Sequence, residues 1–133
     1  MIVLDTHVLV RDAIDPARLS SRARDLLEEG EASNSLACSD ISLWEVATLA
    51  SLGRIEFPGT LDSWLAIAAN PKTVRILPIT PMIATEVARL PDSFHRDPAD
   101  RLIVATSRVH GMPVLTKDSA ISKSGLVRLW PQK

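Results

Sequence analysis

The sequence contains few of the residues that disulfide-bonded, zinc-binding and membrane proteins need. Its one cysteine, Cys38, lies in an apolar run and excludes an intramolecular disulfide or a zinc site built from several cysteines. We expect a buried, inert thiol. No apolar run reaches the roughly 20 residues of a membrane span, and the apolar start of the chain is too short for a signal peptide. These absences predict a soluble, cytoplasmic protein that does not bind a membrane.

An imbalance of charge is also lacking. The 133 residues include 15 basic and 16 acidic side chains, which gives a formal net charge of −1. The chain therefore has no global charge signature of nucleic-acid binding, although a local basic patch would not show in the sum. The length suits one domain with a hydrophobic core, and no repeat or linker divides it. We expect a single domain over residues 1–133.

Short apolar runs alternate with helical patterns along the chain. The runs are continuous, as is typical of strands buried on both faces. They cover residues 2–4, 35–38, 74–79, 113–116 and 126–130. The patterns between them predict helices that end at Gly30, Gly53 and Gly111, and one that begins with a Thr80 cap and Pro81. This alternation predicts an α/β fold with a parallel sheet of four or five strands and helices on both sides.

Four acidic residues follow the predicted strands on the same side. Asp5 comes directly after the first run, and Asp118 follows the fourth run with one residue between. Glu45 lies in the first turns of the helix after the second run, and Asp100 lies in the first turn of the helix before the fourth. In an open parallel sheet, ligands bind at the carboxyl ends of the strands. The shared edge therefore predicts that these four side chains meet in one site.

Each acid also has a purely structural interpretation. Asp5, Asp97 and Asp118 each precede a predicted helix, so their side chains are candidates for capping its amino terminus. Asp97 is the strongest candidate, because a proline follows at the first helical position. Asp100 then completes the capping pattern or complements the helix dipole. In the corresponding alternative, Glu45 is a solvated helix residue.

Clustered carboxylates repel one another, and this repulsion decides what the predicted site can hold. Two carboxylates about 4 Å apart cost roughly 1 kcal/mol in water and about 4 kcal/mol at an effective dielectric constant of 20. A group of four must bind protons or cations, and oxygen ligands without cysteine or paired histidines favour Mg²⁺ or Mn²⁺. Such an ion orients a phosphate and activates a water, so the residues predict hydrolysis of a phosphodiester.

Four segments carry a resemblance to a known family, and they occur in the order IVLDTHVLV, ISLWEVATLASLGRI, HRDPADRLIVATS and VLTKDSAI. Together they resemble PIN-domain ribonucleases over the whole chain, specifically the VapC-type toxins of type II toxin–antitoxin systems. The resemblance implies a single PIN domain with a three-layer α/β/α sandwich around a parallel sheet. It also implies Mg²⁺- or Mn²⁺-dependent endoribonuclease activity on RNA, homodimers, and inhibition by a small VapB-type antitoxin that inserts a segment near the acids.

The resemblance also implies roles for individual residues. The family's catalytic and metal-binding acids correspond to Asp5, Glu45, Asp100 and Asp118. The Thr6 hydroxyl is expected to hold a metal-bound water or a phosphate. Asp97 either joins the metal site or only caps the helix. Arg101 contacts phosphate or the antitoxin, or alternatively forms a surface salt bridge. We expect His95 to be structural or to lie at the rim of the site.

Other classes of protein fit the residues less well. One alternative is a PIN fold that only binds RNA or protein. A test of metal-dependent RNA cleavage would distinguish this alternative from an enzyme. A phosphoacceptor receiver domain has a similar size and alternation, and Lys117 resembles its lysine. A receiver, however, needs paired acids after its first strand, where this chain has only one acid. It also needs an aspartate after its third strand, where this chain has no acid. A haloacid-dehalogenase-type phosphatase needs a second aspartate at the position of His7.

Overall fold

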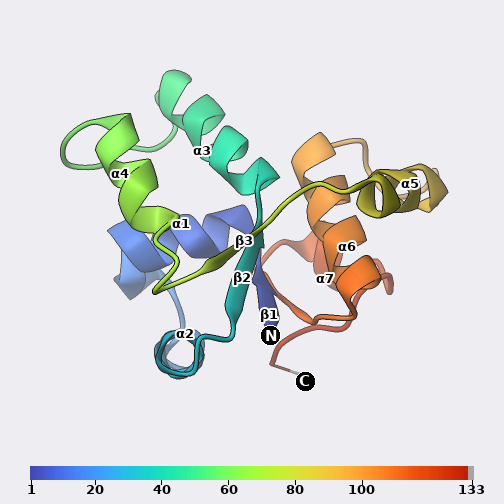
Figure 1. Ribbon diagram of the computed structural model, residues 1–133, viewed down its shortest axis with the longest axis horizontal. Helices are drawn as coiled ribbons and strands as arrows, with labels where there is room; N and C mark the ends of the chain where they lie inside the picture. Colours follow the sequence, from blue (N-terminus) through green and yellow to red (C-terminus); the bar gives the residue numbers. More distant parts are fainter. Residues whose placement is uncertain (132–133) are drawn as a thin grey trace.

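A parallel sheet lies at the centre of the computed structural model, which describes residues 1–131 (Figure 1). Its strands are β1 (Ile2–Leu4), β2 (Leu36–Ser39), β3 (Arg75–Leu77) and β4 (Val114–Leu115), in the order β3-β2-β1-β4. Val3 pairs with Ala37 on one side and Val114 on the other. The predicted parallel sheet is confirmed with four strands, and the run 126–130 adds only an isolated bridge between Val114 and Leu129.

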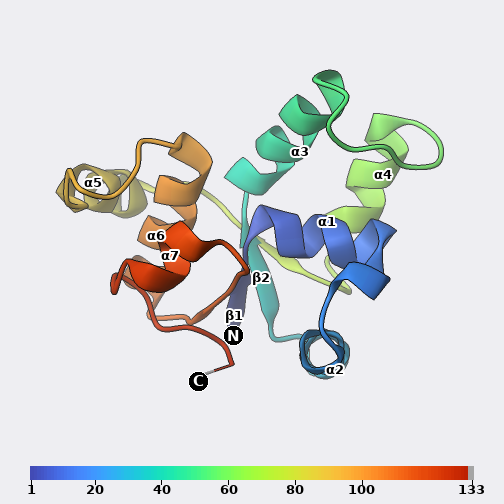
Figure 2. The same cartoon turned by 180° about the vertical axis from the view of Figure 1, so that it is seen from behind.

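Helices cover both faces of the sheet, which makes the three layers that were expected (Figures 1 and 2). α1 and α2 lie on one side, and α6 and α7 lie together on the other. The bounds are α1 (Thr6–Ile14), a 3₁₀ turn η1 (Pro16–Arg18), α2 (Ser21–Ala32), α3 (Ile41–Ser51), α4 (Leu61–Ala68), α5 (Pro81–Arg89), α6 (Pro98–His110) and α7 (Ser119–Lys123).

Successive residues of the strands face opposite layers, so the sheet has a hydrophobic core on each side. Leu4 and Cys38 belong to one cluster, together with side chains of α1 and α2. Val3 and Ala37 point the other way and pack against Ile103 of α6. Cys38 is buried, as expected, and burial raises the pKa of its thiol to about 12. Both faces being apolar explains the continuous hydrophobic runs of the sequence.

Two glycines that the sequence treats alike have different roles. Gly111 has φ of 66° and ends α6, as predicted. Gly30 does not end α2, which continues to Ala32, so that prediction is wrong. A Cβ atom at Gly30 would lie 2.4 Å from Cδ2 of Leu36, so glycine is needed there for close packing against β2. The predicted start of α5 is confirmed, because the Thr80 hydroxyl accepts a hydrogen bond from the Ile83 amide at 3.2 Å.

The parallel arrangement brings several helix ends to one edge of the sheet. β1 leads into α1, β2 into α3 and β4 into α7, so these helices begin at the carboxyl ends of the strands. α6 runs back into β4, which places its amino terminus at the same edge. No helix within residues 1–131 is long and apolar enough to cross a membrane.

Candidate active site

Asp5 is the most deeply buried of the predicted site residues, with 1% of its surface exposed. It stands at the N-cap position of α1, yet its side chain makes no capping hydrogen bond, so the capping alternative is wrong. Oδ2 accepts a hydrogen bond of 2.5 Å from the Thr116 hydroxyl, whereas Oδ1 is buried without a partner among the described residues. Burial raises the pKa of Asp5, and Asp118 raises it further, while Thr116 and His7 oppose the shift.

Asp100 lies in the first turn of α6 and has 8% of its surface exposed. Its Oδ2 is 3.1 Å from Nε2 of His95. The pKa of Asp100 rises to about 8, first because the carboxyl is buried and then because other carboxylates surround it. Those carboxylates belong to Asp5, Asp97, Asp118 and Glu45, in decreasing order of effect. The acids that the sequence places at one edge therefore lie close enough to act on a single group.

Glu45 is half-buried on α3, so it is not the solvated helix residue of the alternative interpretation. Its Oε1 is buried and has no hydrogen-bond partner among the described residues. Burial raises the pKa of Glu45, the Thr6 hydroxyl lowers it, and Asp97 and Asp5 raise it. Thr6 itself is fully buried, and its hydroxyl lies 2.8 Å from the Ser42 hydroxyl, within hydrogen-bonding distance. Glu45 therefore approaches the cluster from the α3 side.

Asp97 and Asp118 both cap helices, as their structural interpretations predicted. Oδ1 of Asp97 accepts hydrogen bonds from the backbone amides of Ala99 at 2.9 Å and Asp100 at 3.2 Å. Oδ1 of Asp118 accepts from the Ile121 amide at 3.0 Å. Each cap uses one oxygen and leaves the other for different contacts. Capping therefore fixes the position of both carboxylates without excluding them from a site.

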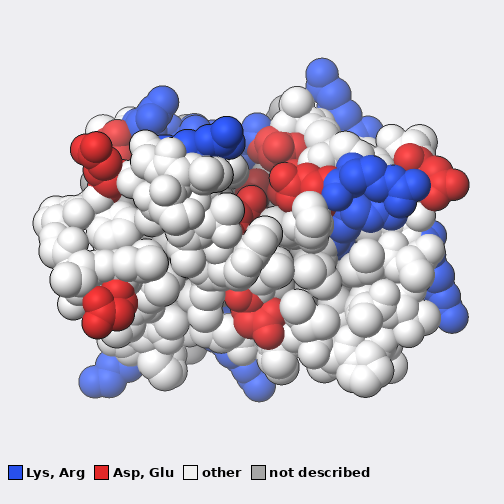
Figure 3. All heavy atoms as spheres, turned by 90° about the horizontal axis from the view of Figure 1, so that it is seen from above, with Lys and Arg blue, Asp and Glu red and all other residues white. Residues whose placement is uncertain are grey.

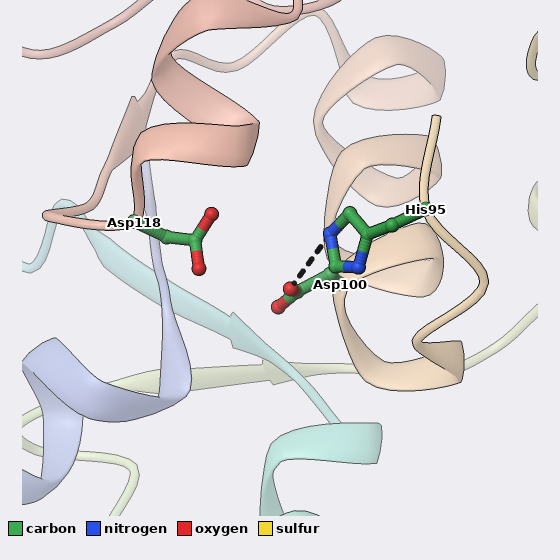
Figure 4. A group of neighbouring side chains, drawn as sticks. All are labelled: His95, Asp100 and Asp118. Carbon is green, nitrogen blue, oxygen red and sulfur yellow. Dashed lines mark ion pairs between the residues drawn. The ribbon is translucent and has the colours of Figure 1, made fainter. Parts of the chain in front are cut away.

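His95 comes closer to the acids than the sequence suggested. One ligand atom each from His95, Asp100 and Asp118 lie within 4.8 Å of one another, a separation that a single metal ion can span. Figure 4 shows the three side chains pointing toward a common space between α6 and the start of α7. Within residues 1–131, no other group of three potential metal ligands is this compact. Asp5 and Glu45 act on Asp100 through their charge but stand outside this compact group.

Acidic side chains are visible at the surface above the carboxyl ends of the strands. Figure 3 shows them near the middle of this face, with lysine and arginine side chains on both sides. A cavity of about 490 Å³ adjoins Glu45 and Asp97, and its lining includes Arg11, Arg18 and Arg54. Another cavity, of about 510 Å³, is lined by the amino-terminal ends of β2 and β3 and contains no carboxylate side chain. This second cavity therefore contains none of the predicted site residues.

A family profile described as PIN domain matches residues 2–125. The chain belongs to the PIN-domain family. It is 41% identical to Ribonuclease VapC22 of Mycobacterium tuberculosis (strain ATCC 25618 / H37Rv) over 117 residues, which cover 88% of this chain and 86% of that protein.

Solved structures with the same fold include two proteins bound to DNA fragments and one toxin–antitoxin complex. The chain resembles VapBC2 from Rickettsia felis bound to a promoter DNA fragment, with a TM-score of 0.72, 17% identity and 97% of each chain covered. It resembles FitAB bound to an IR36 DNA fragment with a TM-score of 0.67, 22% identity, and coverage of 98% of this chain and 94% of that one. It resembles a toxin–antitoxin complex from Klebsiella pneumoniae with a TM-score of 0.58, 18% identity, and coverage of 90% of this chain and 88% of that one. At these identities, the likeness shows the fold.

Arg101 of this PIN domain differs from its expected surface position. The side chain is buried, with 7% exposed, so it forms no surface salt bridge. Its Nη1 donates hydrogen bonds to the backbone carbonyls of Phe94 at 2.9 Å and His95 at 3.1 Å. The guanidinium also lies 6.0 Å from the centre of the Phe94 ring. These contacts point Arg101 toward the loop before α6, and they do not support its expected role as a contact for phosphate or antitoxin.

Two hydroxyl residues of the site carry signals that sequence reasoning passed over. Thr116 follows β4 directly, as Asp5 follows β1, so the two strand ends are neighbours and their side chains can meet. Ser42 precedes Glu45 by three residues on α3, which places it on the same side of the helix. Its fully buried hydroxyl meets that of Thr6. Both signals are positions relative to an acid rather than recognisable motifs.

Proposed function

We propose that this PIN domain, acting as a single domain over residues 1–133, is a metal-dependent endoribonuclease and the toxin of a toxin–antitoxin pair. The observation that carries the proposal is the convergence of carboxylates on Asp100, whose pKa rises to about 8. Buried groups with strongly shifted pKa values in a charged cluster are typical of functional sites. The 41% identity to Ribonuclease VapC22 supports RNA as the substrate.

The side chains at the carboxyl edge fit a divalent cation. Oδ1 of Asp5 and Oε1 of Glu45 are buried and lack hydrogen-bond partners in the described part of the chain, so they are available as ligands. Carboxylate oxygens are preferred by Mg²⁺ and Mn²⁺. We propose that Asp5, Glu45, Asp100 and Asp118 hold one of these ions, with Asp97 nearby. An ion bound there would neutralise charge on the scissile phosphate and lower the pKa of the attacking water.

Neighbouring hydroxyl groups and helix caps prepare the carboxylates for this role. The hydrogen bond from Thr116 holds one oxygen of Asp5, which leaves Oδ1 for the cluster. The Thr6 hydroxyl stabilises the charged form of Glu45, since it lowers the pKa of that carboxyl. The cap on α7 holds Asp118 by one oxygen. These contacts reduce the freedom of the acids before substrate binds, which is what a preorganised site requires.

We propose that the protein's partner is a small antitoxin of the VapB type. The structures that share its fold include VapBC2 from Rickettsia felis, FitAB and a toxin–antitoxin complex from Klebsiella pneumoniae. The cavity of about 490 Å³ beside Glu45 combines apolar side chains, carboxylates and three arginines, so it suits a peptide segment of mixed character. A homodimer stays a prediction from the family resemblance.

RNA cleavage by the purified full-length chain tests the proposed function. We expect cleavage with Mg²⁺ or Mn²⁺, no cleavage with EDTA, and loss of cleavage in Asp5→Asn. The amide oxygen of this variant can still accept the Thr116 hydrogen bond, so its fold should persist. Asp25→Asn on the exposed surface of α2 removes the same charge away from the site and should cleave normally. A folded Asp5→Asn that cleaves RNA as fast as the parent would refute the proposal.

A further inference from the structure

The loop before α6 places a histidine nitrogen inside the carboxylate cluster. Nε2 of His95 is buried, although 38% of the side chain is exposed. It lies 3.1 Å from Oδ2 of Asp100 without the alignment that a hydrogen bond needs. The Asp118 carboxylate faces the same space from the other side (Figure 4). A ring nitrogen that is buried, unpaired by hydrogen bonds and directed at two carboxylates requires an explanation.

The spacing of these atoms matches the ligands of one ion. Two adjacent ligands of an octahedral ion, each about 2.1 Å from it, lie about 3.0 Å apart. The separation of Nε2 of His95 from Oδ2 of Asp100 is 3.1 Å, and one ligand atom each from His95, Asp100 and Asp118 lie within 4.8 Å of one another. Glu45 and Asp5 are not part of this compact group. The histidine therefore belongs to the same compact group of potential ligands as Asp100 and Asp118.

Three contacts hold the His95 ring in this position. Phe94 is buried at the hydrophobic cluster between α6 and α7 and anchors the loop. Arg101 donates to the carbonyls of Phe94 and His95, which fixes the peptide bonds before and after His95. The rings of Phe94 and His95 lie 4.6 Å apart at an angle of 60°. Metal-binding side chains are commonly oriented by such surrounding contacts. Arg101 therefore acts as a positioning residue for His95.

The acids that act on Asp100 from outside this group also lack the partners that a closed structural cluster would have. Asp5 is 1% exposed, and its Oδ1 accepts no hydrogen bond from any described residue. The buried Oε1 of Glu45 is in the same state. Buried acceptors without donors are costly, and native proteins retain them chiefly where a ligand satisfies them. This independent observation points to a cation among the acids whose charges act on Asp100, the neighbour of His95.

We propose that His95 is a nitrogen ligand of the divalent cation held by Asp100 and Asp118. The inference rests on the proposed metal-dependent function and adds a ligand to it. Imidazole favours transition metals, whereas Mg²⁺ prefers oxygen ligands. His95 therefore shifts the preference of the site from Mg²⁺ toward ions such as Mn²⁺ and Co²⁺. The histidine thus determines which metal the enzyme uses, apart from any effect on the rate of cleavage.

Electron spin echo envelope modulation of the full-length protein with Mn²⁺ alone tests this directly. Nitrogen bound to Mn²⁺ gives a ¹⁴N modulation, and labelling of histidine with ¹⁵N changes it only if that nitrogen is imidazole. We expect the modulation in the parent, its loss in His95→Asn and His95→Gln, and its persistence in His7→Asn. His7 is the matched control, because it is an exposed histidine in the cavity beside Glu45. Circular dichroism without metal checks that each variant is folded.

Metal affinities give a second readout. We expect His95→Asn to weaken Mn²⁺ binding by about tenfold or more, since even outer contacts of metal ligands change affinity by about 10- to 100-fold. Mg²⁺ binding should weaken less, so the preference of the site for Mn²⁺ over Mg²⁺ should fall. If the parent binds Mn²⁺ and cleaves RNA without ¹⁴N modulation, or if the modulation survives in His95→Asn, the inference is wrong and the proposed function stands. If the parent binds no Mn²⁺ at millimolar concentration, both are wrong.

Discussion

The strained carboxylate cluster predicts that Asp100→Asn stabilises the protein in the absence of metal. The pKa of Asp100 rises from 3.8 to about 8 in the folded state. Between these values the folded protein retains a proton that the unfolded chain releases, so stability falls as pH rises from about 4 to about 8. Asparagine has the shape of the protonated acid but has no charge to regain on unfolding. The substitution should therefore remove this pH-dependent loss.

The size of the effect follows from the same values. At pH 7.5, keeping the carboxyl protonated against an ordinary pKa of 3.8 costs about 5 kcal/mol, at about 1.4 kcal/mol for each pH unit. This is an upper bound, because side chains and water relax around the cluster, and the variant also changes the contact of 3.1 Å with Nε2 of His95. We expect a net gain of about 2 kcal/mol, which raises the melting temperature by roughly 7 °C for a domain of this length. At pH 5 the same reasoning leaves about a third of the gain.

Thermal melts of the parent and Asp100→Asn, at equal protein concentration with EDTA, measure this difference at pH 7.5 and pH 5. Mn²⁺ at one hundred times its dissociation constant should stabilise the parent by about 2.7 kcal/mol, and it should raise the melting temperature of the parent more than that of the variant. Asp25→Asn, on the exposed surface of α2, should melt like the parent under all conditions. The reasoning is refuted if Asp100→Asn melts below the parent in EDTA at both pH values and Mn²⁺ shifts both proteins equally.

Two further predictions concern the helices that shape the site. Asp97→Asn keeps the oxygen that accepts hydrogen bonds from the amides of Ala99 and Asp100, so this variant should retain its stability and much of its RNA cleavage. Asp97→Ala loses that oxygen, so its free energy of unfolding in denaturant should fall by about 1 kcal/mol. Equal loss of cleavage in Asp97→Asn and Asp100→Asn at saturating Mn²⁺ would instead place Asp97 in the metal site. Gly30→Ala should destabilise the protein by about 1 to 3 kcal/mol, because its Cβ would meet Leu36 at 2.4 Å, and a neutral or stabilising result in urea titration would contradict this account.

The fold was predictable where one physical requirement dominates the local sequence. Continuous apolar runs require burial on both faces, and four of the five runs form strands. The fifth, residues 126–130, forms a single bridge to Val114, because β4 is two residues long and Pro113 and Pro131 supply no amide hydrogen at either end. The predicted end of the second helix at Gly30 was wrong, because glycine is selected both where a helix ends and where a helix packs closely against a strand.

The candidate site was predictable only as far as strand order determines it. Strand ends gather at one edge whatever the side chains do, so the positions of Asp5, Glu45, Asp100 and Asp118 follow from topology. Topology does not determine which carboxylate oxygens remain free. A carboxylate before a helix can cap the helix, as Asp118 does, or leave it uncapped, as Asp5 does. That choice depends on neighbours such as Thr116, which come from a different strand.

The environment of His95 depends on backbone needs that no residue pattern displays. The phrase HRDPADR consists largely of charged and polar residues, which usually face solvent. The loop before α6, however, leaves backbone carbonyls at Phe94 and His95 that require donors once they are buried. Arg101 meets that need by turning inward, and in doing so it fixes the segment that carries the histidine. An arginine retained for the backbone of a loop can thereby determine which nitrogen faces a cluster of acids.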